Sequence, residues 1–304
     1  MELRQLRSLL AVGDHGSFSS AASALDTVQS NVSSHISKLE SEINAVLVDR
    51  RTGTLTEQGQ LVAQHARNIL IEIESIYSDL SSLKHDVQGR VRVGIIGTTA
   101  RWLIPVLSEQ MSVSHPKLKV EYLEATSSSL LRWVHDEVLD IAILNAPVLQ
   151  HDITFRTLFE EIMMVTVPKS SPLATQTSVS VRDLEKVELI VPPKGSWFRD
   201  ELDAVAAKNR VQLSTKLEID GLRLIAALSE DGHGAAVVPA TSVSPSTRAS
   251  MAVIPIVDLA PRKVGLARRK NRIESAATKA LVLSLSEIFT NHQSILPVGV
   301  SSLR

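Results

Sequence analysis

The stretch from Ser17 to Glu40, SFSSAASALDTVQSNVSSHISKLE, most narrowly limits what this chain can fold into. Its apolar residues recur at helical spacing in two short runs, and residues 26–28 form a tight turn between them. This pattern predicts a helix-turn-helix. The outward positions of the second helix are short polar groups and one cation, which suit a helix that lies in a DNA major groove and reads base edges: Gln29, Ser30, Asn31, Ser33, Ser34, His35 and Lys38.

The flanking segments extend this unit. Residues 1–13 form an amphipathic helix, and residues 46–48 and 54–56 are short extended runs around a glycine turn, which is typical of a β-wing. Arg50 and Arg51 on that turn are candidate phosphate contacts; the alternative is that they are merely solvated, and the neighbouring motif favours phosphate contact. Three residues at the helix starts complete the candidate DNA-binding set: Ser17, Phe18 and Thr27.

From residue 57 to residue 87 the pattern is that of one long helix with a continuous heptad stripe. Such a stripe predicts pairing with a second copy of the same helix. The alternative is a helix that packs on its own domain. The residues assigned to the dimer seam are Val62, Ala66, Ile69, Ile73, Ile76, Leu80 and Leu83.

Composition limits the function further. The 304 residues suffice for two domains or more, and a net charge of −1 means that a DNA-binding role rests on pattern and not on a basic field. The absence of cysteine excludes disulfides, thiol redox sensing and thiolate metal sites, and it fits a reducing compartment. The charged N-terminus does not resemble a signal peptide, and no apolar run is long enough to span a bilayer, so we expect a cytoplasmic protein.

After Gly89 the pattern changes to alternating strands and helices, which predicts parallel sheets with helices on both faces. The expected architecture is an N-terminal all-α winged helix-turn-helix with a long linker helix, followed by two doubly wound α/β subdomains. The expected boundaries are 1–58 for the DNA-binding domain, 59–88 for the linker helix, 89–164 with 268–292 for subdomain I, 165–267 for subdomain II, and 293–304 for a loose tail.

Polar residues gather where predicted strands end and helices begin, which is where open α/β sheets bind ligands. Residues 97–100 and 193–199 are two such loops, and their hydroxyl and cationic groups suit a small carboxylic acid or another small anion. The alternative is a set of capping and turn residues, and we favour it for Asp220 and His233 individually. The candidate effector-binding residues are Thr98, Thr99, Ala100, Asn145, Lys194, Ser196, Trp197, Arg199, Asp220 and His233.

Catalysis and metal binding are not expected. The chain has no nucleophile elbow, zinc-protease motif, P-loop or complete dinucleotide fingerprint, and its nine histidines show no metal-ligand spacing. We therefore expect no cofactor beyond a small-molecule effector. A basic run between residues 262 and 272 is interpreted as solvated edges of a strand and helix in preference to a second DNA contact.

Residues 1–87 resemble the N-terminal part of LysR-type transcriptional regulators. The resemblance rests on Leu6-Arg7, Gly16-Ser17-Phe18, Ala21-Ala22, Leu25, Gln29-Ser30, Val32-Ser33, Ile36, Leu39-Glu40, Leu47, Arg50, Leu55-Thr56 and Gly59. The second half is similar to the effector-binding half of the same family, which resembles periplasmic solute-binding proteins, through Leu103-Ile104-Pro105, His115-Pro116, residues 139–143 and Gly232-His233-Gly234 with Pro239. Asn31, Val48 and Asn44-Ala45 depart from the residues usual in the family, and Asn31 bears on which bases are read.

The resemblance implies a transcription factor that binds double-stranded DNA at a promoter as a dimer and is controlled by a small molecule. It also implies a tetramer built through the regulatory domains, and RNA polymerase is a further candidate partner. The rival interpretations are a solute-binding protein with no DNA role and, less favoured, an enzyme on an α/β sheet. The effector, the target genes and the choice between activation and repression do not follow from the sequence.

Overall fold

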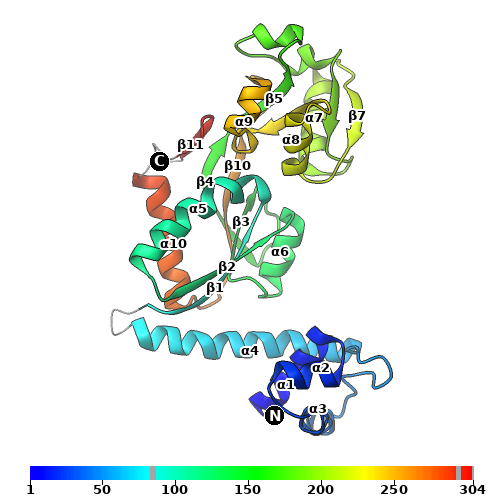
Figure 1. Ribbon diagram of the computed structural model, residues 1–304, viewed down its shortest axis with the longest axis vertical. Coiled ribbons are helices and arrows are strands. Elements are labelled where there is room, and N and C mark those ends of the chain that lie inside the picture. Colours follow the sequence, from blue (N-terminus) through cyan, green and yellow to red (C-terminus); the bar gives the residue numbers. More distant parts are fainter. Residues whose placement is uncertain (83–86, 292–295, 303–304) are drawn as a thin grey trace. The chain divides into compact units, whose positions relative to one another are not determined.

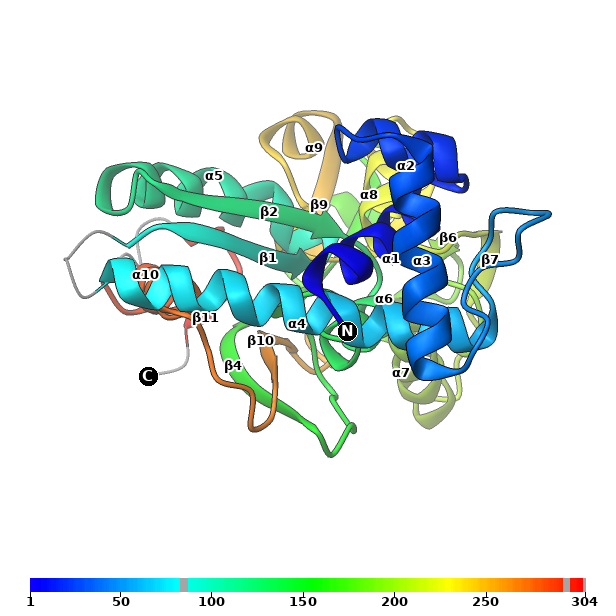
Figure 2. The same ribbon diagram turned by 90° about the horizontal axis from the view of Figure 1, so that it is seen from below.

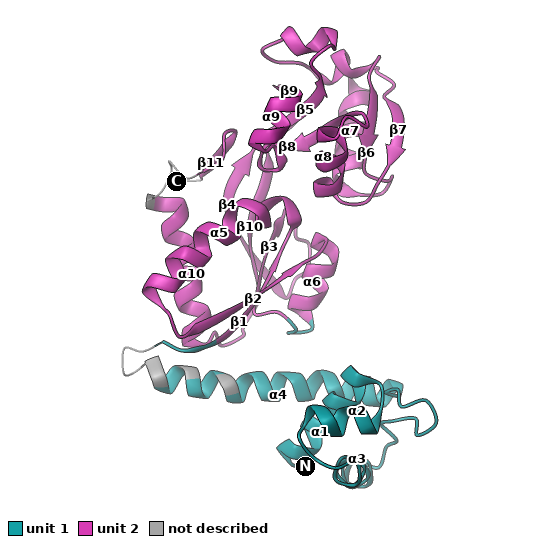
Figure 3. Ribbon diagram, in the orientation of Figure 1, with its two compact units in different colours: residues 1–89, 136–138 teal, residues 90–135, 139–304 magenta. Residues whose placement is uncertain are grey.

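The computed structural model describes residues 1–82, 87–291 and 296–302. The chain divides into two compact units, Met1–Gly89 with Asp136–Val138, and Arg90–His135 with Leu139–Arg304 (Figure 3). Each unit has its own hydrophobic core. The first is helical and the second is α/β, as the sequence predicted.

The first unit begins with three helices packed around a common core of leucine, alanine, valine and isoleucine. The first helix ends at His15, two residues later than the predicted end at Gly13, and Gly16 caps it in the left-handed conformation at φ 69°. Ser17 begins the second as its N-cap, because its side chain accepts the Ser20 N–H. The bounds are α1 Leu3–His15, α2 Phe18–Ala24 and α3 Gln29–Ile43.

The predicted wing is a loop closed by one short pairing. Val48 and Leu55 form an isolated antiparallel bridge, and the Gly53 N–H donates to the Asp49 carbonyl at 2.8 Å. Figure 2 shows this loop projecting beside α3. The prediction of two extended runs around a glycine turn is therefore confirmed only at this bridge.

The linker helix α4 spans Glu57–Ser82. Ala66 was assigned to the dimer seam, but it is fully buried in the core of its own domain together with Ala63, and this part of the assignment is wrong. The helix starts against that core, so its first turns are covered by α1 and not by a partner. Farther along, the apolar side chains of Ile69, Ile76 and Leu80 are 41%, 53% and 57% exposed. Leu83, the last predicted seam residue, lies outside the described residues.

In the second unit, the first sheet has the strand order β11-β4-β10-β3-β1-β2. It is mixed and not parallel as predicted: β1 and β3 run parallel, but β10 is antiparallel to both β3 and β4. Helices α5 and α10 cover one face and α6 the other (Figure 1). The bounds are β1 Gly89–Ile95, α5 Gly97–Ser114, β2 Leu118–Glu124, α6 Ser127–His135, β3 Ile141–Asn145, β4 Ile153–Glu161, β10 Arg262–Arg269, α10 Ala276–Asn291 and β11 Val300–Ser302.

The second sheet has the order β7-β6-β8-β5-β9, with β6 parallel to β7 and β8, and β5 antiparallel to β8 and β9. The chain enters this subdomain after β4 and returns through β10. The bounds are β5 Met163–Pro168, η1 Pro172–Thr175, η2 Val181–Leu184, β6 Glu188–Val191, α7 Trp197–Lys208, β7 Ser214–Glu218, α8 Leu222–Glu230, β8 Ala235–Pro239, η3 Ala240–Ser242, α9 Pro245–Ser250 and β9 Met251–Pro255.

Two predicted boundaries differ from the structure. Subdomain II was expected to continue to residue 267, but residues 262–267 belong to β10 in the first sheet, because they pair with β3 and β4. The tail was expected to be loose, but Val300–Ser302 forms β11 against β4, where its backbone groups pair with an otherwise open sheet edge.

Two glycines with positive φ make a matched test of the wing. A Cβ at Gly53 (φ +73°) would lie 2.4 Å from the Gly16 carbonyl oxygen, whereas a Cβ at Gly16 (φ +69°) would meet nothing within 4 Å. We expect Gly53→Ala to destabilise the first unit by about 2–4 kcal/mol, and Gly16→Ala by only about 1 kcal/mol, the cost of the left-handed conformation alone. Hydrogen exchange of the α1–α3 amides in the full chain measures both. Equal losses would contradict the close packing of the wing against the α1–α2 turn.

Candidate DNA-binding surface and effector cleft

The exposed face of α3 carries a short stripe of uncommitted polar groups. Ser30, Ser34 and Lys38 are four residues apart and therefore lie on one side of the helix, and all three are exposed, as is Gln29 at the helix start. The side-chain amide of Asn31 donates a hydrogen bond to the Thr27 hydroxyl at 3.0 Å, so these two side chains are engaged with each other.

Two other predicted DNA contacts have structural tasks in this unit. His35 was placed on the outward face, but its Nδ1 lies 2.9 Å from the hydroxyl of Ser8, a buried residue of α1. The reason is helical geometry: position 35 lies three after Val32 and four before Leu39, both fully buried, and so borders the inward face. The Ser17 hydroxyl is the N-cap of α2.

Arg50 is bound to α3 and does not extend from the tip of the wing. Its guanidinium donates to the Ser33 and Ser37 hydroxyls at 3.2 and 3.0 Å and to Glu40 at 2.8 Å, and it lies 5.1 Å from the centre of the Phe18 ring. These contacts also engage Ser33 and Phe18. By contrast, the side chain of Arg51 is 91% exposed and remains the candidate phosphate contact of the wing.

Glu40 is the acceptor that joins the wing to α3. Its Oε1 receives the backbone N–H groups of Leu47 and Val48, at 2.8 and 3.2 Å, and its Oε2 receives Arg50. Burial alone would raise the pKa of Glu40, but the Leu47 N–H, Arg50 and the Val48 N–H together outweigh it and hold the pKa below its usual 4.5. The carboxylate form of Glu40 therefore stabilises the wing.

In the second unit, a cavity of about 700 Å³ lies between the two subdomains. Helices α5 and α6 of the first subdomain and α7 and α8 of the second all begin at its wall, through residues 97–98, 127–128, 196–197 and 221–222. The N-terminus of a helix carries free N–H groups and a partial positive charge. Their convergence favours a negatively charged ligand.

The charged groups of this cleft are unequally committed. Arg223 pairs with Glu124 at 3.1 Å. Arg262, 2% exposed, forms a buried ion pair with Glu161 and donates to the Thr98 hydroxyl at 2.7 Å. Lys194 is exposed and has no hydrogen bond or ion pair with any residue that the structure describes, so its charge is available to a ligand.

The structure gathers six of the ten predicted effector residues in this cleft. Those that line it are Thr98, Asn145, Lys194, Ser196, Trp197 and Asp220. Thr99 and Ala100 are buried within α5 beyond the wall. His233 was predicted to follow a strand, but it precedes β8. The cleft lies at the carboxyl ends of the parallel strands, and His233 is at the amino end of β8. His233 therefore does not belong to the cleft.

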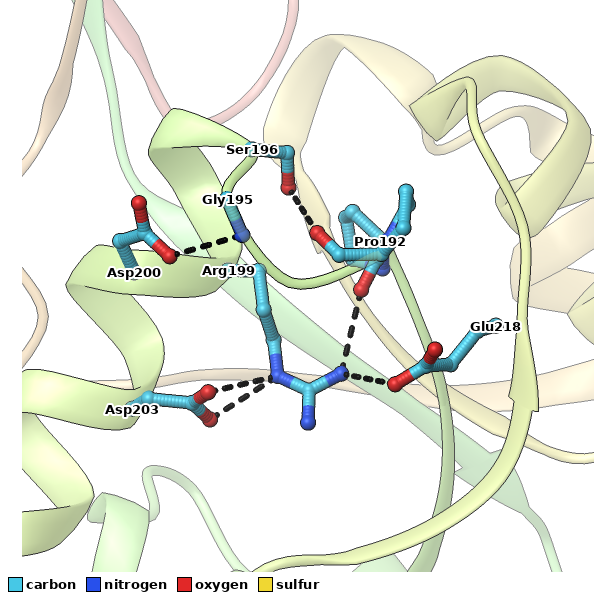
Figure 4. A network of polar contacts seen from close by, with 8 residues as sticks. Pro192, Gly195, Ser196, Arg199, Asp200, Asp203 and Glu218 are labelled. Atoms are coloured by element: carbon cyan, nitrogen blue, oxygen red, sulfur yellow. Dashed lines mark hydrogen bonds and ion pairs between the residues drawn. The ribbon is translucent and has the colours of Figure 1, made fainter.

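Arg199 also lies outside the cleft wall and instead supports it (Figure 4). Its side chain is 7% exposed and donates to Asp203 at 2.9 Å, to Glu218 at 3.1 Å and to the Pro192 carbonyl at 3.1 Å. The Ser196 hydroxyl donates to the Pro193 carbonyl at 2.8 Å. Arg199 is thus a positioning residue that ties the lining loop to α7 and β7.

Several lining residues were missed by the sequence reasoning. Gly97 is one with a visible signal, since a Cβ there would lie 2.4 Å from Glu124 Oε1. Arg262 had no local signal, because it begins a run of basic residues and its partner Glu161 is distant in sequence. The prediction that the basic run of residues 262–272 is solvated is wrong for Arg262, which is buried. The other missed polar residues are Glu124, Thr126, Ser127, Ser128 and Arg223.

Two other kinds of feature are absent from the described residues. No group of histidine, cysteine, aspartate and glutamate side chains there is suited to hold a metal ion. No helix in that part of the chain combines the length and the apolar character needed to cross a membrane.

Comparison with known proteins assigns both units. Residues 3–60 match the family described as "Bacterial regulatory helix-turn-helix protein, lysR family", and residues 84–289 match the "LysR substrate binding domain". A helix-turn-helix unit joined to a ligand-binding unit defines a DNA-binding transcriptional regulator with an effector-binding domain. The chain belongs to the LysR family of such regulators.

Individual relatives agree. The DNA-binding transcriptional dual regulator OxyR of Escherichia coli strain K12 is 26% identical, with 88% of this chain and 90% of that protein covered. Two solved structures share the fold: a full-length OxyR variant from Pseudomonas aeruginosa (TM-score 0.74, 22% identity, 100% and 99% coverage) and full-length CbnR complexed with its target DNA (TM-score 0.71, 21% identity, 94% and 99% coverage).

The role of Glu40 predicts a pH-dependent stability. Its pKa is depressed in the folded protein, so its contribution is complete above the pKa of the unfolded state and is lost as the pH falls through the folded pKa. We expect Glu40→Gln to cost the first unit about 1–2 kcal/mol at neutral pH and progressively less below pH 4.5. Local hydrogen exchange at neutral and acidic pH measures this difference.

The exposed carboxylate of Glu72, on α4, gives the matched control. Glu72→Gln should leave the exchange of the wing amides unchanged at both pH values. A Glu40→Gln effect that is independent of pH would show that shape, and not charge, holds the wing to α3.

Proposed function

We propose that this regulator reads an operator through the exposed stripe of α3 and responds to a small carboxylate held in the cleft between its effector subdomains. The observation that carries the effector part is the convergence of the N-termini of α5, α6, α7 and α8 on one cavity. Their partial positive charges and the ammonium group of Lys194 together outweigh the carboxylate of Asp220, which lines the same cleft.

The buried Arg262 borders the cleft as a hydrogen-bond donor. Its guanidinium has five N–H donors, and the described bonds use Nε and Nη2 toward Glu161 and Thr98. The charge of Arg262 is balanced by Glu161, so this residue offers a ligand hydrogen-bond donors and not a net positive charge. The hydroxyls of Ser127 and Ser128 supply neutral donors for orientation.

Effector binding joins the two subdomains, because α5 and α6 belong to the first and α7 and α8 to the second. A ligand that contacts both favours the arrangement in which they are close. The protein responds only to the extent that this arrangement and the alternative differ in affinity, which is generally worth about 1–3 kcal/mol in allosteric proteins.

For assembly we propose a dimer through the distal part of α4, where Ile69, Ile76 and Leu80 are exposed at heptad spacing. The structure of full-length CbnR complexed with its target DNA supports DNA as the partner of such an assembly. The proposal also includes a tetramer formed by pairing of the regulatory domains and a contact with RNA polymerase. It places the protein in the cytoplasm, together with the DNA that it reads.

The DNA proposal separates base contacts from phosphate contacts. We expect Gln29→Ala to weaken binding to the operator by about 1–3 kcal/mol and to leave binding to scrambled DNA unchanged. Arg51→Ala should weaken both equally and lower the salt dependence of binding by about one charge. Mobility-shift titrations at several salt concentrations, with the DNA beside the protein's own coding region, measure both.

The two variants serve as each other's control, since each alters one exposed side chain of the same unit. If Gln29→Ala weakened binding to both DNAs alike, base reading by the start of α3 would be excluded. A protein without sequence-selective binding to any DNA selected from a random pool would overturn the operator proposal as a whole.

The effector proposal predicts charge selectivity. A panel of small carboxylates, each with its neutral amide, is screened by thermal shift on the full chain. We expect a carboxylate to bind and its amide to bind at least about tenfold more weakly. Lys194→Ala should weaken the carboxylate by a similar factor, whereas Lys186→Ala, which alters an exposed lysine outside the cleft, should not. Equal binding of acid and amide would refute an anionic effector.

A further inference from the structure

Glu124 is the last residue of β2, and it lines the cleft from the first subdomain. Its carboxylate lies over the first turn of α5, because a Cβ at Gly97 would be 2.4 Å from Oε1 and 3.0 Å from the carboxyl carbon. The opposite wall supplies Arg223, the second residue of α8, whose Nε is 3.1 Å from the same Oε1. The cleft therefore contains a carboxylate of the protein itself.

This carboxylate lies beside helix termini that have no acidic residue of their own. The first turns of α5, α6 and α8 contain no aspartate or glutamate, and α8 has Arg223 there instead. A cation in the first turn of a helix is unfavourable, whereas an anion beside it is favourable. Glu124 therefore supplies, from β2, a negative charge that α5 and α8 lack.

The carboxylate of Glu124 is held weakly. It accepts no hydrogen bond within the described part of the chain, and the side chains of Glu124 and Arg223 are 44% and 63% exposed. An exposed ion pair changes an equilibrium by a factor of about five at most. The carboxylate of Glu161 differs, because it is buried and accepts hydrogen bonds from both Arg262 and the Thr241 N–H. Glu124 can therefore leave Arg223 at small cost.

A second contact of opposite charges joins α5 and α8, in a neighbouring cavity of about 500 Å³ that Arg223 also lines. Hydrogen bonds from Ser246 and Thr247, with a smaller contribution from the charge of Arg101, lower the pKa of Glu230 in that cavity. Arg101 and Glu230 are therefore engaged with each other. The Glu124–Arg223 pair is the contact between these subdomains that an anion in the cleft can exchange.

We propose that Glu124 is a built-in competitor for the anionic ligand of the cleft. When no ligand is bound, its carboxylate takes the position beside Arg223 and the start of α5, and a ligand carboxylate displaces it and pairs with Arg223. This inference rests on the anion cleft of the proposed function. A tethered group acts at a high effective concentration. Simple anions are therefore excluded, and only a carboxylate that makes further contacts in the cleft displaces Glu124.

The exchange of partners also changes how the two subdomains are joined. Glu124 belongs to the first sheet and Arg223 to the helix that follows β7 of the second, so their pair is a direct link across the cleft. Displacement of Glu124 replaces this link by one that runs through the ligand. The ligand then has a different affinity for the linked and the exchanged arrangement, which is what a regulatory ligand requires.

The test does not require the natural effector. Glu124→Ala removes the carboxylate, and acetate reproduces the group that is removed. Isothermal titration and thermal shift on the full chain, at constant ionic strength, should show saturable acetate binding that is at least about tenfold tighter in Glu124→Ala than in the wild type. Acetamide, which carries no charge, should show no such gain. Addition of Arg223→Gln to Glu124→Ala should remove the gain.

Glu109→Ala is the matched control. Glu109 is an exposed residue of α5 outside the cleft, about 18 Å along the helix from Gly97. It should bind acetate as the wild type does, because charges that far apart at the surface are screened by salt. All these variants alter exposed side chains, so their melting temperatures without acetate should remain close to that of the wild type.

A second measurement uses the carboxylate that the wild type binds most tightly in the panel described for the effector cleft. Glu124→Gln should bind it about three- to tenfold more tightly, because a competing negative charge is gone. Glu109→Gln should bind it with unchanged affinity.

Two results would overturn the proposal. One is acetate binding that is no tighter in Glu124→Ala than in the wild type. The other is a gain that Glu109→Ala shares, or that persists without Arg223, since it would reflect net charge alone. If a panel carboxylate binds the wild type and Glu124→Gln alike, the competitor is refuted and the anionic effector stands. If acetate binds Glu124→Ala but no panel carboxylate binds the wild type, the anionic effector fails and Glu124 stands as the occupant of the cleft.

Discussion

The arrangement of the effector unit depends on the buried ion pair between Glu161 and Arg262. These residues are partners in the register of β4 and β10, the strands through which the chain leaves and re-enters the first subdomain. Both side chains are nearly inaccessible to solvent, so their remaining polar atoms need partners within the protein. Arg262 donates a hydrogen bond to the Thr98 hydroxyl, and Glu161 accepts one from the Thr241 N–H. A buried pair is seldom a large net source of stability, but removal of one partner leaves an uncompensated charge. It therefore fixes the place where the subdomains join.

The DNA-binding unit uses its charges in a comparable way. Arg50 and Glu40 connect the wing to α3. Arg50, which the sequence places at the tip of the wing, therefore holds the wing against α3. Residues 1–89 carry seven basic against eleven acidic residues, so the unit has no general positive field, and Lys38 and Arg51 are exposed where a groove and a backbone are expected. In the proposed function, specific reading therefore relies on short polar groups at a fixed spacing more than on a general positive field.

The sequence predicted what depends on local pattern. Apolar spacing located α1 to α4, and alternation of strands and helices gave the α/β class and most of the cleft loops, since a helix N-terminus after a strand is a local feature. It could not predict contacts between distant residues. His35 meets Ser8 and Arg262 meets Glu161 only after folding. The antiparallel direction of β10 was not predicted for the same reason. It depends on how the chain returns to the first sheet from the second, where β10 pairs with β3 and β4.

The start of α5 is the point at which these constraints meet. Gly97 and Thr98 border both cavities, and Gly97 admits Glu124 so closely that no larger residue fits without displacement. The Thr98 hydroxyl also accepts a hydrogen bond from Arg262. The same helix turn thus borders both cavities and contacts the ion pair that joins the subdomains. Packed interiors respond to strain by changing between discrete arrangements and not by continuous deformation, so this turn is the place at which a bound molecule would act on the Arg262–Glu161 pair.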